Sequence, residues 1–316
     1  MCANRNTIVA VLCWFSIVAA GQSQARDIYV NNFIGDDRAS GRSPEVTVIN
    51  RPLRTINRAL RLVDRGGRII LAKTEEPYRE MISLSDVNQR GYSDQPLVIV
   101  GNGATLDGTV VAAPGAWKHE RDGIFAMRPR RLAYQQLFLN GEPLRHVRTS
   151  GRPDSAVSLQ PLEWTLRSDR ILFRGEEGRV PHQYDLRHCG LQTGITLYNT
   201  EFVRIEDIIV QGFQQDGINA HELVKGCQLV RVECRANGRS GISVGGVSQM
   251  EIIESHCYDN GRVQLRLEGQ AKVVAERSDF NVDDKAAPWL EIQGDGRAVI
   301  DGREVRISDL ESQRRD

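Results

Sequence analysis

The sequence GITLY at residues 194–198 returns as GINAH at 217–221 and as GISVG at 241–245. A fourth related stretch, VQLRL, follows at 263–267. The first branched apolar residues of these stretches are 23, 24 and 21 residues apart. A second apolar column keeps nearly the same step, and its members are Ile205, Leu229, Ile252 and Val273. Several columns that advance together indicate one structural unit repeated along the chain.

The length of the repeat decides the architecture. Each unit of about 23 residues holds short runs of apolar–polar alternation, which is typical of short strands. Asn237-Gly238 and Asn260-Gly261 supply corner residues between these runs. Two packed helices do not fit in such a unit, and the leucine and asparagine spacing of a leucine-rich repeat is missing. The pattern therefore predicts an all-β solenoid in which each turn buries its apolar face against the next.

The rest of the chain is less regular. Residues 1–25 combine Arg5, an apolar run and small residues near Ala25, which is typical of a cleaved signal sequence. Residues 26–109 are expected to form the first coils, with an amphipathic helix over 52–64 capping the open N-terminal end. Residues 110–190 break the period and are interpreted as a β-rich insertion. Residues 191–316 carry the C-terminal coils and tail.

Composition and charge limit the classes of partner and cofactor that the chain is expected to have. The chain has 41 basic and 41 acidic residues and a formal net charge of zero, so nucleic-acid binding is not expected. The signal sequence predicts a secreted or periplasmic protein with no integral membrane segment after cleavage. No paired cysteine or clustered ligand motif stands out, so neither a metal nor a cofactor is predicted. Cys234 and Cys257 fall in one inward column, and we expect them to be buried free thiols.

The N-terminal part resembles the secreted pectate-lyase-like proteins. The stretches that carry this resemblance include PLRTI at 52–56, GRIIL at 67–71, LVIVG at 97–101 and ATLDG at 104–108. The coils from Gly194 onward resemble the repeats of the same superfamily. The resemblance implies a right-handed parallel β-helix and a role with polysaccharides. That superfamily includes lyases, glycoside hydrolases and proteins without activity.

One sub-family of hydrolases is a poor match. The stretch SGISVGG at 240–246 resembles the polygalacturonase segment that carries a histidine between two glycines. Here Arg239 and Ser240 stand where the first glycine and the histidine are expected, so that hydrolytic set is incomplete.

The outward residues of the repeated strands form the candidate site. Successive side chains of a strand point to opposite faces, and stacked strands lie about 4.8 Å apart. If the isoleucines point inward, polar residues line the outer face as a ladder. We expect its first column to hold Thr196, Asn219, Ser243 and Gln264, and its second column to hold Tyr198, His221, Gly245 and Arg266. Glu268 and Glu291 extend the ladder, and Asp216 flanks it at a corner.

The residue types suggest a chemistry. Arginine neutralises a carboxylate well, while histidine or tyrosine can act as acid or base. We therefore take Tyr198, His221, Arg266 and Asp216 as candidate catalytic residues. The candidate substrate-binding residues are Asn219, Ser243, Gln264, Glu268 and Glu291.

Two functions remain open on the sequence alone. The first is an exported polysaccharide lyase or glycoside hydrolase. The second is a non-catalytic carbohydrate-binding or cell-surface structural protein. If the ladder is only a solvated face, the insertion with Trp117 and Trp164 is the next place to look. The oligomeric state is not indicated.

Overall fold

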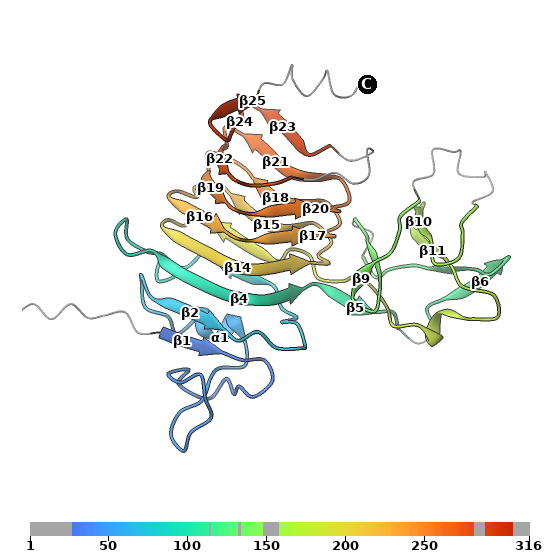
Figure 1. Cartoon of the computed structure of the whole chain (residues 1–316), viewed down its shortest axis with the longest axis horizontal. Helices are drawn as coiled ribbons and strands as arrows, with labels where there is room; N and C mark the ends of the chain where they lie inside the picture. Colours follow the sequence, from blue (N-terminus) through green and yellow to red (C-terminus); the bar gives the residue numbers. More distant parts are fainter. Residues whose placement is uncertain (1–26, 114, 132–133, 148–157, 281–287, 306–316) are drawn as a thin grey trace, which may run out of the picture.

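The computed structural model describes residues 27–113, 115–131, 134–147, 158–280 and 288–305. The expected signal sequence lies outside these ranges. The described chain is almost entirely β, and most of it is built from two sheets that the chain visits alternately. Figure 1 shows their strands stacked from β1 at one end to β24 and β25 at the other, with a smaller group of strands projecting to one side. The predicted parallel pairing over 194–300 is confirmed.

We call the larger sheet, whose principal pairs are parallel, sheet A. Its strands are β1 (Asp27–Val30), β2 (Arg68–Leu71), β4 (Leu97–Asp107), β14 (Val203–Gln211), β16 (Cys227–Val230), β17 (Glu233–Arg235), β19 (Gln249–Ile253), β20 (His256–Tyr258), β22 (Lys272–Glu276), β24 (Arg297–Ile300) and β25 (Arg303–Val305). Only β25 pairs antiparallel, with β24.

The second sheet, sheet B, is parallel throughout. Its order is β3 (Ile82–Leu84), β13 (Ile195–Tyr198), β15 (Asp216–His221), β18 (Ser240–Val244), β21 (Val263–Gly269) and β23 (Leu290–Gly294). From β13 to β23 these strands follow one another along the chain, each separated from the next by one or two strands of sheet A. Each circuit therefore adds one strand to sheet B and one or two strands to sheet A.

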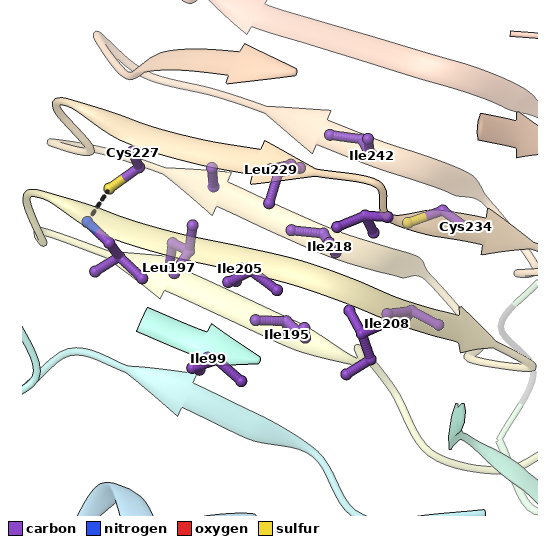
Figure 2. Packing of buried hydrophobic residues seen from close by; sticks show 14 of the residues in the cluster. Ile99, Ile195, Leu197, Ile205, Ile208, Ile218, Cys227, Leu229, Cys234 and Ile242 are labelled. Atoms are coloured by element: carbon purple, nitrogen blue, oxygen red, sulfur yellow. Dashed lines mark hydrogen bonds between the residues drawn. The ribbon is translucent and has the colours of Figure 1, made fainter. Parts of the chain in front are cut away.

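The core lies between the two sheets. Ile205 and Leu229 of sheet A and Ile195 and Ile218 of sheet B are fully buried, and Figure 2 shows their side chains filling the space between the strands. Branched apolar residues recur at these positions in successive coils because equivalent positions point into the core in every coil. Burial of one such side chain contributes roughly 1.5–3 kcal/mol, and stacking repeats that gain.

Polar side chains pair inside the corners. Asn237 Nδ2 donates to the Val210 carbonyl at 3.1 Å, and Asn260 Nδ2 donates to the Cys234 carbonyl at 2.9 Å. Asn260 Oδ1 also accepts from the Asn237 backbone N–H at 3.0 Å. These bonds satisfy backbone groups that the corners would otherwise bury without partners.

The four described cysteines are buried and free. Cys234 and Cys257 lie in register on adjacent strands, and the prediction of stacked thiols is confirmed. Cys227 accepts a hydrogen bond from the Val203 backbone N–H at 3.4 Å, drawn as the dashed line in Figure 2.

The N-terminal helix is shorter than the sequence indicates. Helix α1 spans Ile56–Leu60, with Thr55 as its N-cap. Leu53 is extended instead, because its backbone bonds to Tyr29 and Asn31. The apolar face expected over 52–64 is nevertheless buried in the main core, and Figure 1 places α1 beside β1 and β2 at the N-terminal end of the stack.

Two small four-stranded sheets, separate from the coils, follow β4. The first contains β5 (Thr109–Val111), β8 (Leu137–Leu139), β9 (Glu142–Pro143) and β12 (Leu186–Cys189), and the second contains β6 (Lys118–Arg121), β7 (Ile124–Met127), β10 (Trp164–Arg167) and β11 (Arg170–Arg174). A short 3-10 helix, η1, spans Pro181–Gln183. The pairings that assemble both sheets are antiparallel. Trp164, one of the two tryptophans of the insertion named above as an alternative place for the site, is fully buried here.

Candidate functional site

The outer face of sheet B carries two columns of side chains. The pairing of β13, β15, β18, β21 and β23 places one column in register: Thr196, Asn219, Ser243, Arg266 and Glu291. The second column lies two residues further along each strand and holds Tyr198, His221, Gly245, Glu268 and Gln293. Seven of the nine candidate site residues therefore lie on one face of one sheet.

The position of Arg266 differs from the expectation. The sequence stretches place it beside Gly245, but the structure pairs Arg266 with Ser243 and places Glu268 beside Gly245. The step from β18 to β21 is 23 residues rather than 21, since Ile242 pairs with Leu265. A slip of two residues keeps every side chain on its face, so alternation could not reveal it.

The expected outward position of Gln264 is wrong. Gln264 is 1% exposed, and its Oε1 accepts from Asn260 Nδ2 at 2.7 Å. It occupies the place that Gly241 has in the preceding coil, where a β-carbon would meet Cys257 Sγ at 3.1 Å. This position points into the corner of the core, so Gln264 extends the buried asparagine network instead of contacting a ligand.

Arg266 is the most constrained charge on this face. Its side chain is 9% exposed, and its Nη2 lies 2.6 Å from Glu268 Oε1 and 3.2 Å from Gln293 Oε1. Its Nε lies 3.6 Å from Glu291 Oε1, too far for a hydrogen bond. Nε and Nη1 are both buried without a hydrogen-bond acceptor among the described residues. A buried guanidinium whose N–H groups donate no hydrogen bond destabilises the protein, unless a water or a ligand oxygen accepts from those groups.

Asn219 complements Arg266, because it has a buried acceptor to which no described residue donates a hydrogen bond. Its Nδ2 donates to Asp216 Oδ2 at 2.8 Å, which orients the amide, while Oδ1 is buried and accepts no hydrogen bond from the described part of the chain. Ser243, between Asn219 and Arg266 in the column, is only 2% exposed. The first column thus offers unsatisfied groups at Asn219 and Arg266 and a covered hydroxyl between them.

The second column contains a hollow over Gly245. A β-carbon at Gly245 would stand 3.7 Å from His221 Cβ and 3.8 Å from Glu268 Oε2, with no closer neighbour. His221 and Glu268 lie two strand spacings apart, or about 9.6 Å between their Cα atoms. An imidazole and a carboxylate therefore flank a position that carries no side chain.

Aromatic rings extend this column on the side of His221. The rings of Tyr198 and His221 lie 4.9 Å apart at a tilt of 50°. Tyr198 is 42% exposed, and His221 Nδ1 lies 3.6 Å from Glu222 Oε1. Exposed aromatic faces next to polar groups suit the mixed surface of a sugar ring, which has apolar C–H faces and polar edges.

Asp216 lies beside the ladder but is fully buried. Its carboxylate accepts from Arg239 Nε and Nη2 at 2.9 and 2.6 Å, from Ser240 Oγ at 2.5 Å and from Asn219 Nδ2 at 2.8 Å. The hydrogen bonds that Arg239 donates to Asp216 raise the pKa of Arg239 above its ordinary value. With its acceptor sites filled, Asp216 orients Arg239 and Asn219, and it is not exposed to act as an acid.

The small sheets supply a wall that the sequence does not reveal. A β-carbon at Gly238 would stand 2.7 Å from the Tyr134 carbonyl oxygen, so this segment packs against a coil corner. Tyr134 Oη also lies 3.5 Å from Arg262 Nη1, and Arg262 Nε lies 3.3 Å from Glu291 Oε2. Tyr134, which precedes β8, therefore flanks the ladder at the start of its strands.

A metal centre or membrane span is not evident in the ranges that the structure describes. No group of three or more histidine, cysteine, aspartate or glutamate side chains there could hold a metal ion. None of the helices in those ranges is long and apolar enough to cross a membrane.

Comparisons with known proteins support the fold. No family model and no curated protein matches the sequence. A solved structure described as a glycoside hydrolase matches with a TM-score of 0.58 at 11% identity, over 83% of this chain and 75% of the other. The complex of XylC with xylose matches with a TM-score of 0.52 at 11% identity, over 87% of this chain. This chain spans 65% of that XylC chain, just under two thirds. At such identities the likeness establishes a shared fold and nothing finer.

Proposed function

We propose that the protein is an exported right-handed parallel β-helix that binds a polysaccharide along the outer face of sheet B and processes it over Gly245. The handedness follows the strong preference for right-handed crossovers between parallel strands of one sheet. Export to the periplasm or the exterior rests on the signal-like sequence of residues 1–25. The fold shared with a glycoside hydrolase and with a protein bound to xylose is compatible with this role.

The observation that carries the proposal is the set of idle polar groups at Arg266 and Asn219. Two guanidinium nitrogens and one amide oxygen lie at the ladder, buried and without partners among the described residues. A sugar hydroxyl both donates and accepts, so hydroxyls of successive sugars along the chain can satisfy Asn219 Oδ1 and Arg266 Nη1, which lie two strands apart. A ligand that forms hydrogen bonds with buried groups lacking a partner gains more binding free energy than a ligand that only replaces bound water.

The hollow over Gly245 is the proposed place of reaction. A glycosidic linkage lying against the backbone there would have His221 on one side and Glu268 on the other. Imidazole and carboxylate are the groups that most often move protons in enzymes. Arg266, at 2.6 Å from Glu268, holds that carboxylate in place and balances its charge. Under this proposal Tyr198 provides a stacking surface for the next sugar.

A second candidate is binding without turnover. It is favoured by the pairing of the carboxylates, since Glu268 contacts Arg266 and Glu291 contacts Arg262. A carboxylate held by an arginine is less free to turn toward a ligand and exchange a proton with it. In this case the ladder and the wall near Tyr134 form a binding groove, and the protein acts as a carbohydrate-binding or cell-surface module.

One screen distinguishes these functions. The purified protein is incubated with neutral and uronic-acid polysaccharides, and binding, new reducing ends and unsaturated products are measured together. Unsaturated ends identify a lyase, reducing ends alone identify a hydrolase, and binding alone supports the second candidate. Absence of binding to any polysaccharide contradicts both.

The matched variants are Glu268→Gln and Glu251→Gln. Glu251 is an exposed carboxylate on β19 of sheet A and contacts Gln228. If processing occurs over Gly245, Glu268→Gln lowers turnover by about 10²-fold, the usual scale for loss of acid–base help. Glu251→Gln leaves turnover unchanged.

A further inference from the structure

A cavity of about 600 Å³ lies between the small sheets and the first strands of sheet B. Val110 and Met127 of the small sheets line one side, and Met81 and Leu191, beside β3 and β13, line the other. None of its lining residues belongs to the ladder of sheet B, so this cavity is separate from the polysaccharide site. Its size falls in the range of small-molecule pockets.

The walls of this cavity are mostly apolar, with His188, Gln192 and Gln214 among the polar residues, and its permanently charged side chains are all arginines. Arg128, Arg130 and Arg131 all line it. Arg128 is neutralised, because its Nε lies 3.0 Å from Asp169 Oδ2. Arg130 and Arg131 are exposed and form no ion pair within the described ranges. The mouth of an apolar cavity therefore carries two guanidinium groups that have no counter-ion among the described residues.

A buried histidine completes the lining. His188 is 7% exposed, and its Nδ1 lies 3.0 Å from the Cys189 carbonyl oxygen. A carbonyl only accepts, so Nδ1 carries the proton and Nε2 is left as an acceptor. Burial lowers the pKa of His188 below its ordinary value, which keeps the ring neutral near pH 7.

We propose that this cavity binds a small organic anion with an apolar body, such as an aryl or short acyl carboxylate or sulfonate. The apolar walls accept the body, and Arg130 and Arg131 pair with the anionic group at the mouth, where guanidinium and carboxylate geometry match. His188 Nε2 accepts from a hydroxyl or amine N–H on the ligand. A bare sugar fits this cavity poorly, because its hydroxyls would face apolar walls without partners.

The probe for this site is anilinonaphthalene sulfonate, an aromatic anion whose fluorescence rises in apolar surroundings. Titration of the folded full-length protein is expected to give saturable binding at one site. Phenylnaphthylamine, which has a similar aromatic body and no charge, is expected to bind at least tenfold more weakly. Equal affinity for the two probes would overturn the proposal, because it would indicate apolar adsorption only.

The variant that tests the cations is the double substitution Arg130→Ala and Arg131→Ala. Both side chains are exposed, so the fold is not expected to depend on them. Sulfonate affinity should fall at least tenfold, while phenylnaphthylamine affinity stays unchanged. Arg38→Ala, on the far N-terminal segment with a side chain 90% exposed, is the control and should change neither. Unchanged sulfonate binding in the double variant would contradict the assignment.

Discussion

Arg266 and Glu268 lie two residues apart on β21, with Arg266 Nη2 2.6 Å from Glu268 Oε1. Residues two apart on a strand share a face, so this contact links the two columns of the sheet B ladder. The largely buried Arg266 therefore contacts the carboxylate of Glu268, which lies beside Gly245, while standing in the same column as Asn219.

The first prediction concerns this cation. Arg266→Met should reduce polysaccharide affinity, and any turnover, by about 10²-fold, because the variant loses the idle donors and leaves Glu268 without its partner. Affinity electrophoresis on the polysaccharide found in the screen measures this change. Arg231→Met is the control, since Arg231 forms a comparable pair with Asp207 on sheet A. Equal losses in both variants would point to a general effect of charge.

The second prediction concerns stability. Asp216→Asn should lower the free energy of unfolding by about 3 kcal/mol or more, because it removes a fully buried carboxylate and leaves Arg239, whose side chain is only 18% exposed, without its counter-ion. Asp207→Asn removes a similar bidentate partner from Arg231, but that aspartate is 33% exposed in its side chain. The expected cost there is about 1 kcal/mol or less. Urea unfolding of both variants gives the comparison, and similar losses would argue against a structural role of Asp216.

The third prediction concerns the thiols. Burial raises the pKa of Cys189 to about 12 and of Cys227 to about 11, so neither is a thiolate near neutral pH. The native protein should resist iodoacetamide, and after unfolding in urea four thiols per processed chain should react. Peptide mapping without reductant provides the check. A linked pair of Cys234 and Cys257 would contradict the expectation, and alkylated Cys2 or Cys13 would show that the signal is retained.

The fourth prediction concerns acid. An unfolded histidine has a pKa of about 6.5, and burial lowers the pKa of His188 in the folded state. Below about pH 6.5 the unfolded chain binds a proton that the folded chain does not, so stability falls as pH drops and is complete above that value.

Unfolding free energies near pH 7.5 and 5.5 test this effect. The parent protein should lose more stability between them than His188→Gln does, whatever the offset at neutral pH. His182→Gln, an exposed histidine on the same segment, should behave like the parent. If all three proteins show the same slope, His188 does not contribute.

The coils could be predicted from sequence because their signal repeats. Ile195, Ile218 and Ile242 mark the inward column, and the structure pairs them as the spacing indicated. The predicted alignment of β21 with β18 was wrong by two residues. Val263 and Leu265 are both apolar and two residues apart, so either could be aligned with Ile242. The structure pairs Leu265, not Val263, with Ile242, and the two alignments share the same alternation, so the sequence pattern could not separate them.

The site could be predicted only in part, for a related reason. Alternation identified the outer face and most of its residues, including His221 and Glu268. It could not show that Asp216 is fully buried, because burial there depends on Arg239 from the next coil. The wall near Tyr134 depends on packing between segments far apart in sequence, and no local pattern reports that contact.

The central claim is that a polysaccharide lies in the hollow over Gly245, and the Gly245→Leu variant tests it most directly. A β-carbon there meets its neighbours at ordinary contact distances of 3.7 Å or more, so the fold should accept the side chain. Leucine would nevertheless fill the gap between His221 and Glu268. The account predicts an unchanged unfolding free energy and a loss of polysaccharide binding of at least tenfold, while Glu251→Leu on sheet A binds like the parent. Parental binding by a folded Gly245→Leu protein would contradict the account.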